Sequence, residues 1–415
     1  MRAVFVAILL PLLPACGLRT AAALREPGVR VELADRLVAT LDRQDHYFAT
    51  ETDRDAFARR LGAIAREARD ASTYYTALSD ALASLGEGHT GLVGSEAVPF
   101  SSTIPPVALL EVDGTAVVAG VAPGVEGGGL RPGDAVLEVD GVPAHRAIEG
   151  RLEVTSGSTP HGRRARAVSN LLAGPTRVPA RVRVRGIDGR ERTAYPLRFL
   201  LDDEGIHRFR FGFVPPALHD TALSPAVLYL SLPDFHPDRR GEVEEVLQRL
   251  GDMPELVLDL RGNPGGRIRT LQRIAGFFID GPETLVMLQE GAGMQPVRAL
   301  PGPVRYRGRV HLLVDERTGS AAELLAAALQ DLGRATVYGR TTAGSARSRL
   351  SALLPGNVVF HYAGRAEFRR RDGRRIEGRG IEPDVFYQPQ RDELARGIYG
   401  DPHRDPLIRL ALGRN

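Results

Sequence analysis

Short apolar runs alternate with segments of helical periodicity between residues 227 and 332. Each apolar run has about the length of a buried strand. The expected strands are Val227–Leu230, Leu256–Leu260 and Val310–Val314, and the expected helices are Val243–Leu250, Ile268–Phe278 and Ala321–Leu332. Strands that alternate with helices favour a parallel or mixed sheet with covering helices, and function tends to lie at the carboxyl ends of such strands. We therefore predict an α/β core.

The chain is long enough for other domains, because 415 residues correspond to two or three domains of roughly 100–200 residues each. Leu33, Leu37 and Leu41 recur at helical spacing and belong to a pattern that predicts three amphipathic helices before residue 85. The expected organisation is a leader at 1–15, a linker at 16–28, a helical domain at 29–100, a β domain at 101–200, the α/β core at 201–390 and a C-terminal tail at 391–415.

The expected β domain contains a glycine-rich segment, Gly127–Gly141, that predicts a turn, a strand and an Asp-Gly hairpin. The segment closely resembles the core motif of PDZ domains, which bind carboxyl-terminal peptides by adding them to a sheet edge. By this resemblance, Gly129 and Leu130 belong to a peptide-binding site. The module would continue through a helix at Ala165–Leu172 and strands at Ala180–Arg185 and Arg192–Leu197. A generic β-sandwich fragment is the alternative.

The sequence contains no lysine. The combined count of lysine and arginine is 54, so all 54 residues are arginine. This excludes P-loop nucleotide hydrolases, protein kinases, pyridoxal enzymes and serine/lysine hydrolases, all of which need a lysine. The net charge is only +3, so we interpret the arginines as a composition bias and expect no nucleic-acid partner. The arginine-rich stretch at 365–379 indicates a solvated hairpin around Asp372-Gly373, and a patch for anionic lipid or nucleic acid is the alternative.

The first sixteen residues have the features of an export signal. Arg2 precedes an apolar run, Ala3–Leu13, which is shorter than the roughly 20 residues that span a bilayer. The segment that follows, Pro14-Ala15-Cys16, completes a sequence that resembles the lipobox of bacterial lipoproteins. The resemblance implies lipidation at Cys16, a membrane partner and a location in the bacterial cell envelope, periplasm or outer membrane. An ordinary secretory signal is the alternative, and it also exports the protein.

Neither a metal nor an organic cofactor is expected. Cys16 is the only cysteine, so the chain can form no internal disulfide and no cysteine cluster for zinc. The ten histidines are scattered, and no H-E-x-x-H motif is present. The segment Gly86–Gly91 matches G-x-G-x-x-G, but it follows a helical pattern and not a strand, so it is not a dinucleotide-binding motif.

Two turns after predicted strands have a composition suited to catalysis. The turn Arg261–Gly266 is rich in glycine, which lets backbone N–H groups point into a cleft and stabilise an oxyanion. The turn Thr318–Glu323 places Ser320 at the positive end of the next helix, where its hydroxyl could act as a nucleophile. Taken singly, a plain loop and an N-cap serine are the alternatives.

The order of five segments gives these turns a common interpretation. The segments are GEGHTGL around His89, LVLDLRGNPGG from Leu256, VDERTGSAAEL around Ser320, GRTTAGS from Gly339 to Ser345, and IEGRGIEPDV from Ile376 to Val385. In this order the chain resembles the carboxyl-terminal processing (tail-specific) serine peptidases from about residue 30 to 390. That family carries its PDZ domain between the first two segments. The resemblance implies a ClpP/crotonase-like α/β core.

The segment Gly339–Ser345 distinguishes two branches of that family. The serine/lysine branch has its catalytic lysine where this chain has Ser345. The chain therefore resembles the other branch, that of the tricorn core protease and the interphotoreceptor retinoid-binding protein modules in clan SK. The tricorn-like pattern has a serine directly before the histidine, where this chain has Gly88.

The resemblance to this branch assigns roles to individual residues. Ser320 is the expected nucleophile, His89 the general base and Glu377 the carboxylate that orients it, with Glu382 and Glu87 as alternatives for the carboxylate. The expected oxyanion donors are the amides of Ala321 and Gly265, with Gly266 less favoured. A neutral imidazole can accept the serine proton near pH 7 and return it to the leaving amine.

The sequence supports two functional hypotheses. The first is an exported, lipid-anchored serine endopeptidase that cleaves unfolded or carboxyl-terminally presented polypeptides by a Ser-His-Glu mechanism. The second is a catalytically inactive lipoprotein of the same fold that binds peptides or an apolar ligand. Cleavage of peptides would distinguish the first from the second.

Overall fold

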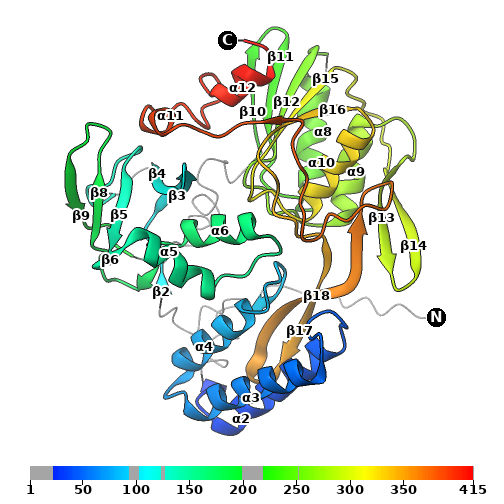
Figure 1. Ribbon diagram of the computed structural model, residues 1–415. Helices are drawn as coiled ribbons and strands as arrows, with labels where there is room; N and C mark the ends of the chain where they lie inside the picture. Colours follow the sequence, from blue (N-terminus) through cyan, green and yellow to red (C-terminus); the bar gives the residue numbers. More distant parts are fainter. Residues whose placement is uncertain (1–21, 93–101, 123–126, 199–217, 251, 415) are drawn as a thin grey trace. The chain divides into compact units, whose positions relative to one another are not determined.

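The computed structural model describes residues 22–92, 102–122, 127–198, 218–250 and 252–414 (Figure 1). This part of the chain forms two compact units. Among the described residues, the first unit combines 22–85 with 90–92 and 349–363, and the second unit contains the rest. The leader with Cys16 lies outside the described residues. Within the described ranges, no helix combines the length and the apolar character that a membrane span requires.

Three helices make up most of the first unit, as the leucine spacing predicts. They are α2 (Pro27–Asp42), α3 (Glu51–Glu67) and α4 (Ala71–Ala83). The Thr50 hydroxyl accepts a hydrogen bond from the Asp53 N–H and caps α3, and the Asp70 carboxylate caps α4 in the same way. The predicted leucines are completely buried between the helices. Local periodicity and caps therefore specify this part of the fold.

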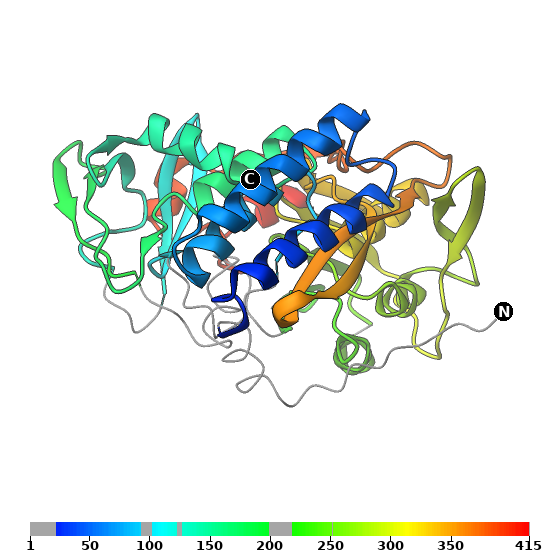
Figure 2. The same ribbon diagram turned by 90° about the horizontal axis from the view of Figure 1, so that it is seen from below.

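A β-hairpin from much later in the chain completes the first unit. Its strands are β17 (Arg347–Leu354) and β18 (Val358–Arg369), joined by the short 3-10 turn η1 (Pro355–Asn357). Leu354, Val358 and Phe360 are buried in the same apolar cluster as the helices. The two-residue strand β1 (Gly91–Leu92) pairs with β18. Figures 1 and 2 both show the hairpin, in orange, beside the blue helices. Local sequence patterns do not predict this association.

The second unit begins with a β domain. Its strands are β2 (Ser102–Thr103), β3 (Val107–Val112), β4 (Thr115–Val121), β5 (Ala135–Val139), β6 (Val142–Pro143), β7 (Gly174–Pro175), β8 (Val182–Arg185) and β9 (Glu191–Ala194), and its helices are α5 (Ala144–Glu153) and α6 (Pro160–Ser169). The main sheet has the order β3-β4-β5-β8-β9. Asp140 and Gly141 join β5 to β6 with φ values of +51° and +87°, which is the hairpin that the Asp-Gly pair predicts. Helix α5 was not predicted.

A mixed α/β sheet forms the core of the second unit, as the alternating pattern predicts. Its strands, in spatial order, are β10 (His219–Ser224), β11 (Val227–Ser231), β12 (Glu255–Asp259), β15 (Arg309–Val314), β16 (Ala335–Gly339) and β19 (Val385–Phe386). Only β10 runs antiparallel to its neighbour. Because β12 and β15 are adjacent and parallel, the turns that follow them lie side by side at the carboxyl ends of the strands.

Helices cover both faces of this sheet. Helices α8 (Arg239–Leu250), α9 (Ile268–Phe278) and α10 (Ala321–Asp331) share one apolar cluster with the strands. Alternate strand residues, among them Val227 and Val257, pack instead with Leu407 and Ile408 of α12 (Pro406–Ala411) on the other face. A further hairpin, β13 (Thr284–Glu290) and β14 (Gly293–Arg298), pairs with the end of β18. Neither this hairpin nor β16 was predicted.

The C-terminal segment, which also contains α11 (Arg391–Ala395), is tied to the core by a buried arginine. The Arg261 guanidinium lies 2.6 Å from Asp259 Oδ2 and 2.8 Å from Asp405 Oδ2, and it stacks on the Tyr399 ring at 4.9 Å. Arg261 and both carboxylates are almost inaccessible to solvent. Asp405 also accepts the N–H of Leu407 at the start of α12. One carboxylate therefore neutralises a buried charge and caps a helix.

We predict that Asp405→Ala lowers the free energy of unfolding by about 2–3 kcal/mol, because Arg261 Nη1 and the first turn of α12 lose a charged partner while Asp259 still neutralises the guanidinium. Urea denaturation would measure the loss. The control is Asp392→Ala on α11, which removes an exposed ion pair with Arg396 and should cost less than about 1 kcal/mol. Equal losses in the two variants would contradict this account of the buried pair.

Candidate active site

Ser320 lies directly before α10, at the end of the loop that leaves β15. Its φ of +52° is in the left-handed region, which costs a residue with a side chain about 1–3 kcal/mol. The Gly319 N–H donates to the Asn263 carbonyl (2.9 Å) and the Ser320 N–H donates to Glu323 Oε2 (2.9 Å), and these bonds hold the strained turn. A strained strand-to-helix turn of this kind presents the nucleophile in hydrolases with a nucleophile elbow.

The glycine-rich turn after β12 packs directly against Ser320. Gly265 has a φ of +94°, and a Cβ added there would lie 2.7 Å from Ser320 Cβ, from the Ala321 nitrogen and from the Gly319 oxygen. No other residue fits without moving the backbone of the Ser320 turn. The Gly262 N–H donates to Asp315 Oδ1 (2.8 Å), which joins the two turns a second time. The sheet topology therefore brings together the two turns that the sequence singled out.

The backbone bonds of Gly265 change the expected oxyanion donors. Its N–H donates to Asn263 Oδ1 (2.8 Å), so this amide is already engaged, contrary to its expected role. Its carbonyl accepts from the Phe235 N–H (2.9 Å), and in a trans peptide the following N–H, that of Gly266, points the opposite way. Among the described residues, neither Gly266 nor Ala321 donates its amide to another group. Gly266 thus replaces Gly265 as the candidate partner of Ala321.

A completely buried carboxylate, Glu323, lies under Ser320. It accepts the Ser320 N–H and the Ser345 N–H (each 2.9 Å) on Oε2, and the Thr342 hydroxyl and the Gly344 N–H (each 2.6 Å) on Oε1. Burial raises the pKa of Glu323 to about 7, although all four donors oppose the shift. The carboxylate therefore fastens the start of α10 to the turn at 342–345.

The turn that carries His89 is held by the β domain. The Gly88 N–H donates to Ser158 Oγ (3.1 Å), and Arg166 of α6 donates to the Gly88 carbonyl (3.4 Å). Gly88 also lies against Ser345, whose own amide binds Glu323. The structure thus brings the peptide before His89 and the turn of Ser320 to the same segment, residues 342–345.

Glu377 is the expected carboxylate that joins this cluster. It is buried and accepts the N–H groups of Ala346 (2.6 Å) and Arg347 (2.9 Å). Burial raises its pKa, and these donors and the charge of Arg347 limit the rise.

The two alternatives to Glu377 have other environments. Glu382 is exposed, and its backbone carbonyl accepts from Gln330. Glu87 accepts the His89 N–H (2.8 Å) and is therefore bonded within the His89 turn itself. Of the three carboxylates, Glu377 is the one that binds the backbone amides directly after Ser345.

The two residues expected in the peptide site of the β domain serve its folding. Leu130 is buried in the apolar core of the domain, and its N–H donates to the Gly127 carbonyl (3.0 Å). Gly129 has a φ of +95°, and its carbonyl accepts from Arg192 (3.3 Å). Both residues therefore shape the turn before β5, and neither the side chain nor the amide of Leu130 is available to a peptide.

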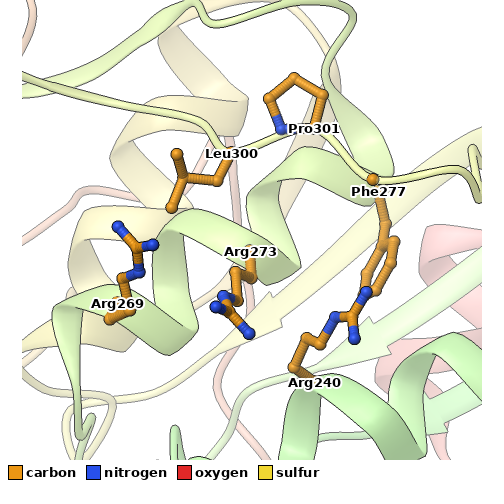
Figure 3. Close-up of a pocket in the computed structure, with 7 residues that line it drawn as sticks. Arg240, Arg269, Arg273, Phe277, Leu300 and Pro301 are labelled. Atoms are coloured by element: carbon orange, nitrogen blue, oxygen red, sulfur yellow. The ribbon is translucent and has the colours of Figure 1, made fainter.

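A basic hollow of about 310 Å³ lies elsewhere on the core, between α8, α9 and the segment 300–302 (Figure 3). Arg240 from α8 and Arg269 and Arg273 from α9 line it, together with the ring of Phe277. Arg240 pairs with Glu244 at 2.8 Å. None of the expected site residues contributes to this hollow, so size alone does not locate the site. Within the described ranges, no group of side chains has the composition of a metal site.

Three residues of the cluster were missed by the sequence analysis. Glu323 had a usable signal, because Ser320-Ala-Ala-Glu323 is an S-x-x-E capping box at the start of a predicted helix. Ser158 and Ser345 had none. Their hydroxyls become neighbours of the His89 turn only in the folded chain.

The chain is similar to known peptidases in sequence and in fold. Residues 226–387, which include Ser320 and Glu377, match the model of peptidase family S41. This segment, here called the S41 domain, is thus similar to that peptidase family. The chain is 31% identical over 160 residues to a probable CtpA-like serine protease of Staphylococcus aureus and 32% identical over 161 residues to carboxyl-terminal-processing peptidase 3 of Arabidopsis thaliana. Each match covers 38% of this chain, and the chain spans about a third of the length of these relatives (32% and 31%).

Solved structures share the fold beyond the S41 domain. Mature CPAF aligns over 93% of this chain and 98% of its own, with a TM-score of 0.69 and 16% identity. The photosystem II D1 C-terminal processing protease aligns over 91% of this chain and 99% of its own, with a TM-score of 0.54 and 20% identity. The mixed α/β fold is thus the fold of these proteases.

We predict that Glu323→Gln flattens the pH dependence of stability. The folded state holds the proton of Glu323 up to a pH of about 7, whereas a carboxyl in the unfolded chain loses it near its ordinary pKa. Wild-type stability should therefore fall as the pH rises through this window, and the contribution should be absent from the variant. Urea denaturation at several pH values between 5 and 8 measures both slopes.

The control for this experiment is Glu245→Gln, an exposed glutamate on α8. It should keep the wild-type slope. The absolute stability of Glu323→Gln does not decide the question, since an amide cannot accept from four donors and the variant loses stability at every pH. Identical slopes in wild type and Glu323→Gln would contradict the prediction.

Proposed function

We propose that this protein is a serine peptidase in which Ser320 is the nucleophile, His89 the general base and Glu377 the carboxylate that supports the histidine. The observation that carries the proposal is the placement of Ser320 within the S41 domain, in a strained turn at a helix N-terminus and packed against the glycine-rich turn. The names of the relatives, a serine protease and a carboxyl-terminal-processing peptidase, describe the same chemistry and support it.

The proposed reaction proceeds in two steps. Ser320 Oγ attacks the carbonyl carbon of the scissile peptide bond while His89 takes its proton, and the resulting imidazolium gives that proton to the leaving amine. A water molecule, deprotonated in turn by His89, then hydrolyses the acyl-enzyme and restores the serine. The amides of Ala321 and Gly266 would hold the oxyanion in both steps, and each such donor is worth roughly 2.7–4 kcal/mol in characterised hydrolases.

We further propose that the substrate peptide binds along the edge strand of the β domain. Strand β3 is an edge of the main sheet, and α6 packs beside it, with Arg164 of α6 paired to Glu111 of β3 at 2.7 Å. A sheet edge beside a helix is the arrangement in which PDZ domains add an extended peptide as a new strand. The substrate class we propose is therefore an unfolded or carboxyl-terminally presented polypeptide.

The export of the protein belongs to the same proposal. The basic tip, the short apolar run and the small residues before Cys16 support cleavage of a leader and attachment of lipid to that cysteine. A lipid anchor would hold the peptidase at a bacterial envelope membrane. Metabolic labelling with a fatty-acid analogue, compared between wild type and Cys16→Ser, tests the anchor separately from the chemistry.

We expect wild type to cleave a mixed peptide library, and Ser320→Ala and His89→Ala each to reduce kcat/KM at least about 1000-fold, because either change removes the proton-transfer pair. The full chain, purified in mild detergent, would be incubated with the library and the products read by mass spectrometry. The products would also give the cleavage preference.

Matched controls separate the chemistry from general damage. Ser351→Ala and His403→Ala change an exposed serine and an exposed histidine and should keep wild-type activity. A Ser320→Ala variant that cleaves like wild type would refute the assignment. Folded wild-type protein that binds peptides without cleaving them would favour the binding lipoprotein instead.

A further inference from the structure

The basic hollow between α8 and α9 lies close to the glycine-rich turn of the candidate site. The N–H of Phe235, in the segment that leads to α8, donates to the Gly265 carbonyl (2.9 Å), and the Arg267 N–H donates to the Phe235 carbonyl (3.0 Å). The two segments therefore run side by side into α8 and α9. Arg269 follows Gly266 by three residues, so their Cα atoms are at most roughly 11 Å apart. Three or four residues of an extended peptide span this distance.

The residues that line the hollow include three arginines and no carboxylate (Figure 3). Arg240 of α8 is paired with Glu244. Arg269 and Arg273 of α9 are exposed and, within the described part of the chain, form no ion pair and no side-chain hydrogen bond. Residues four apart on a helix are neighbours, so these two charges repel each other. The volume of about 310 Å³ is sufficient for a small ligand site.

The charges of α9 also oppose the stability of the helix. Arg267 is its N-cap and Arg269 lies in its first turn, whereas the first turn has no acidic residue and the last turn no basic one. The helix dipole favours the reverse arrangement, with acidic residues at the N-terminus and basic residues at the C-terminus. Local choices that oppose stability are expected at functional sites. An anion bound between the arginines would compensate both unfavourable terms.

We propose that this hollow is a specificity site that binds aspartate or glutamate side chains of the substrate. The inference rests on the proposed peptidase function. Guanidinium groups bind carboxylates through two parallel hydrogen bonds, and Arg269 and Arg273 each have one such group to offer. Arg273 lies about 6 Å further along α9 than Arg269, which places the acidic residues about three to six positions from the scissile bond. The favoured substrates are therefore unfolded polypeptides with an acidic segment near the cleaved bond.

The test compares two peptides that differ only in charge. One is a library substrate with Asp or Glu about three to six positions from the cleaved bond, on each side in turn, and the other has Asn or Gln there. Both have blocked ends, so that only side-chain carboxylates differ. We expect wild type to cleave the acidic peptide with a kcat/KM about 10-fold higher, and added salt should reduce this ratio.

Substitutions in the hollow should change this ratio. Arg269→Gln and Arg273→Gln should each lower it about threefold, and the double variant should bring it close to one. Arg273→Glu should reverse the preference, so that a peptide with arginine at the same positions is cleaved faster than the acidic one. The control is Arg409→Gln, an exposed arginine on α12 at the other face of the sheet, which should keep the wild-type ratio.

The kinetic outcomes separate the inference from the peptidase function. Wild type that cleaves both peptides equally overturns the acidic site and leaves the peptidase function intact. A preference for the acidic peptide that Arg269→Gln and Arg273→Gln leave unchanged overturns it as well, because the carboxylates then bind elsewhere. Retention of that preference by Arg273→Glu has the same meaning.

A binding measurement decides the case in which wild type cleaves neither peptide. That result ends the peptidase function, and the Kd of each fluorescently labelled peptide is then measured by anisotropy with the full chain. Tighter binding of the acidic peptide, lost in the double arginine variant, supports the acidic site. Equal binding of the two peptides overturns it. Calorimetric binding of inorganic phosphate that depends on Arg269 and Arg273, combined with equal binding of the peptides, would assign the hollow to a free phosphate instead.

Discussion

The geometry around Ser320 depends on one buried carboxylate. Glu323 accepts four hydrogen bonds, one from the Ser320 amide and three from the turn at 342–345, so a single group joins the start of α10 to a segment that follows β16. Its desolvation is costly and is offset only while all four donors are present. The strained φ of Ser320 persists because this network over-determines it.

Three glycines, which have no side chain, let the segments around this carboxylate approach each other. Gly265 lies against the Ser320 turn, Gly344 lies between Thr159 of the β domain and the amide of Gly380, and Gly88 lies against two serines. At Gly265 and Gly344 the φ is also positive, so glycine satisfies space and conformation at once. Six separate parts of the chain thus meet here, at distances that leave no room for a Cβ at these glycines.

The local elements of the fold could be predicted, and the long-range ones could not. Leucine spacing located α2–α4, and apolar runs located β11, β12 and β15, because periodicity records which face of a segment is buried. The hairpin β17–β18 was missed as a partner of the first helices, since its burial depends on residues about 300 positions away. Asp405 likewise gave no sign that it would neutralise Arg261.

The sequence by itself determined the nature of the core, the absence of any lysine-based chemistry and the two turns that carry Ser320 and Gly266. Residue type, local spacing and motif order contain this information. Only the tertiary structure decided that the amide of Gly265 is engaged, that Glu323 lies beneath Ser320 and that Ser158 accepts the Gly88 N–H. The physical reason is that a hydrogen bond depends on distance and direction within a few tenths of an ångström, and chain folding sets these for residues that sequence order keeps far apart.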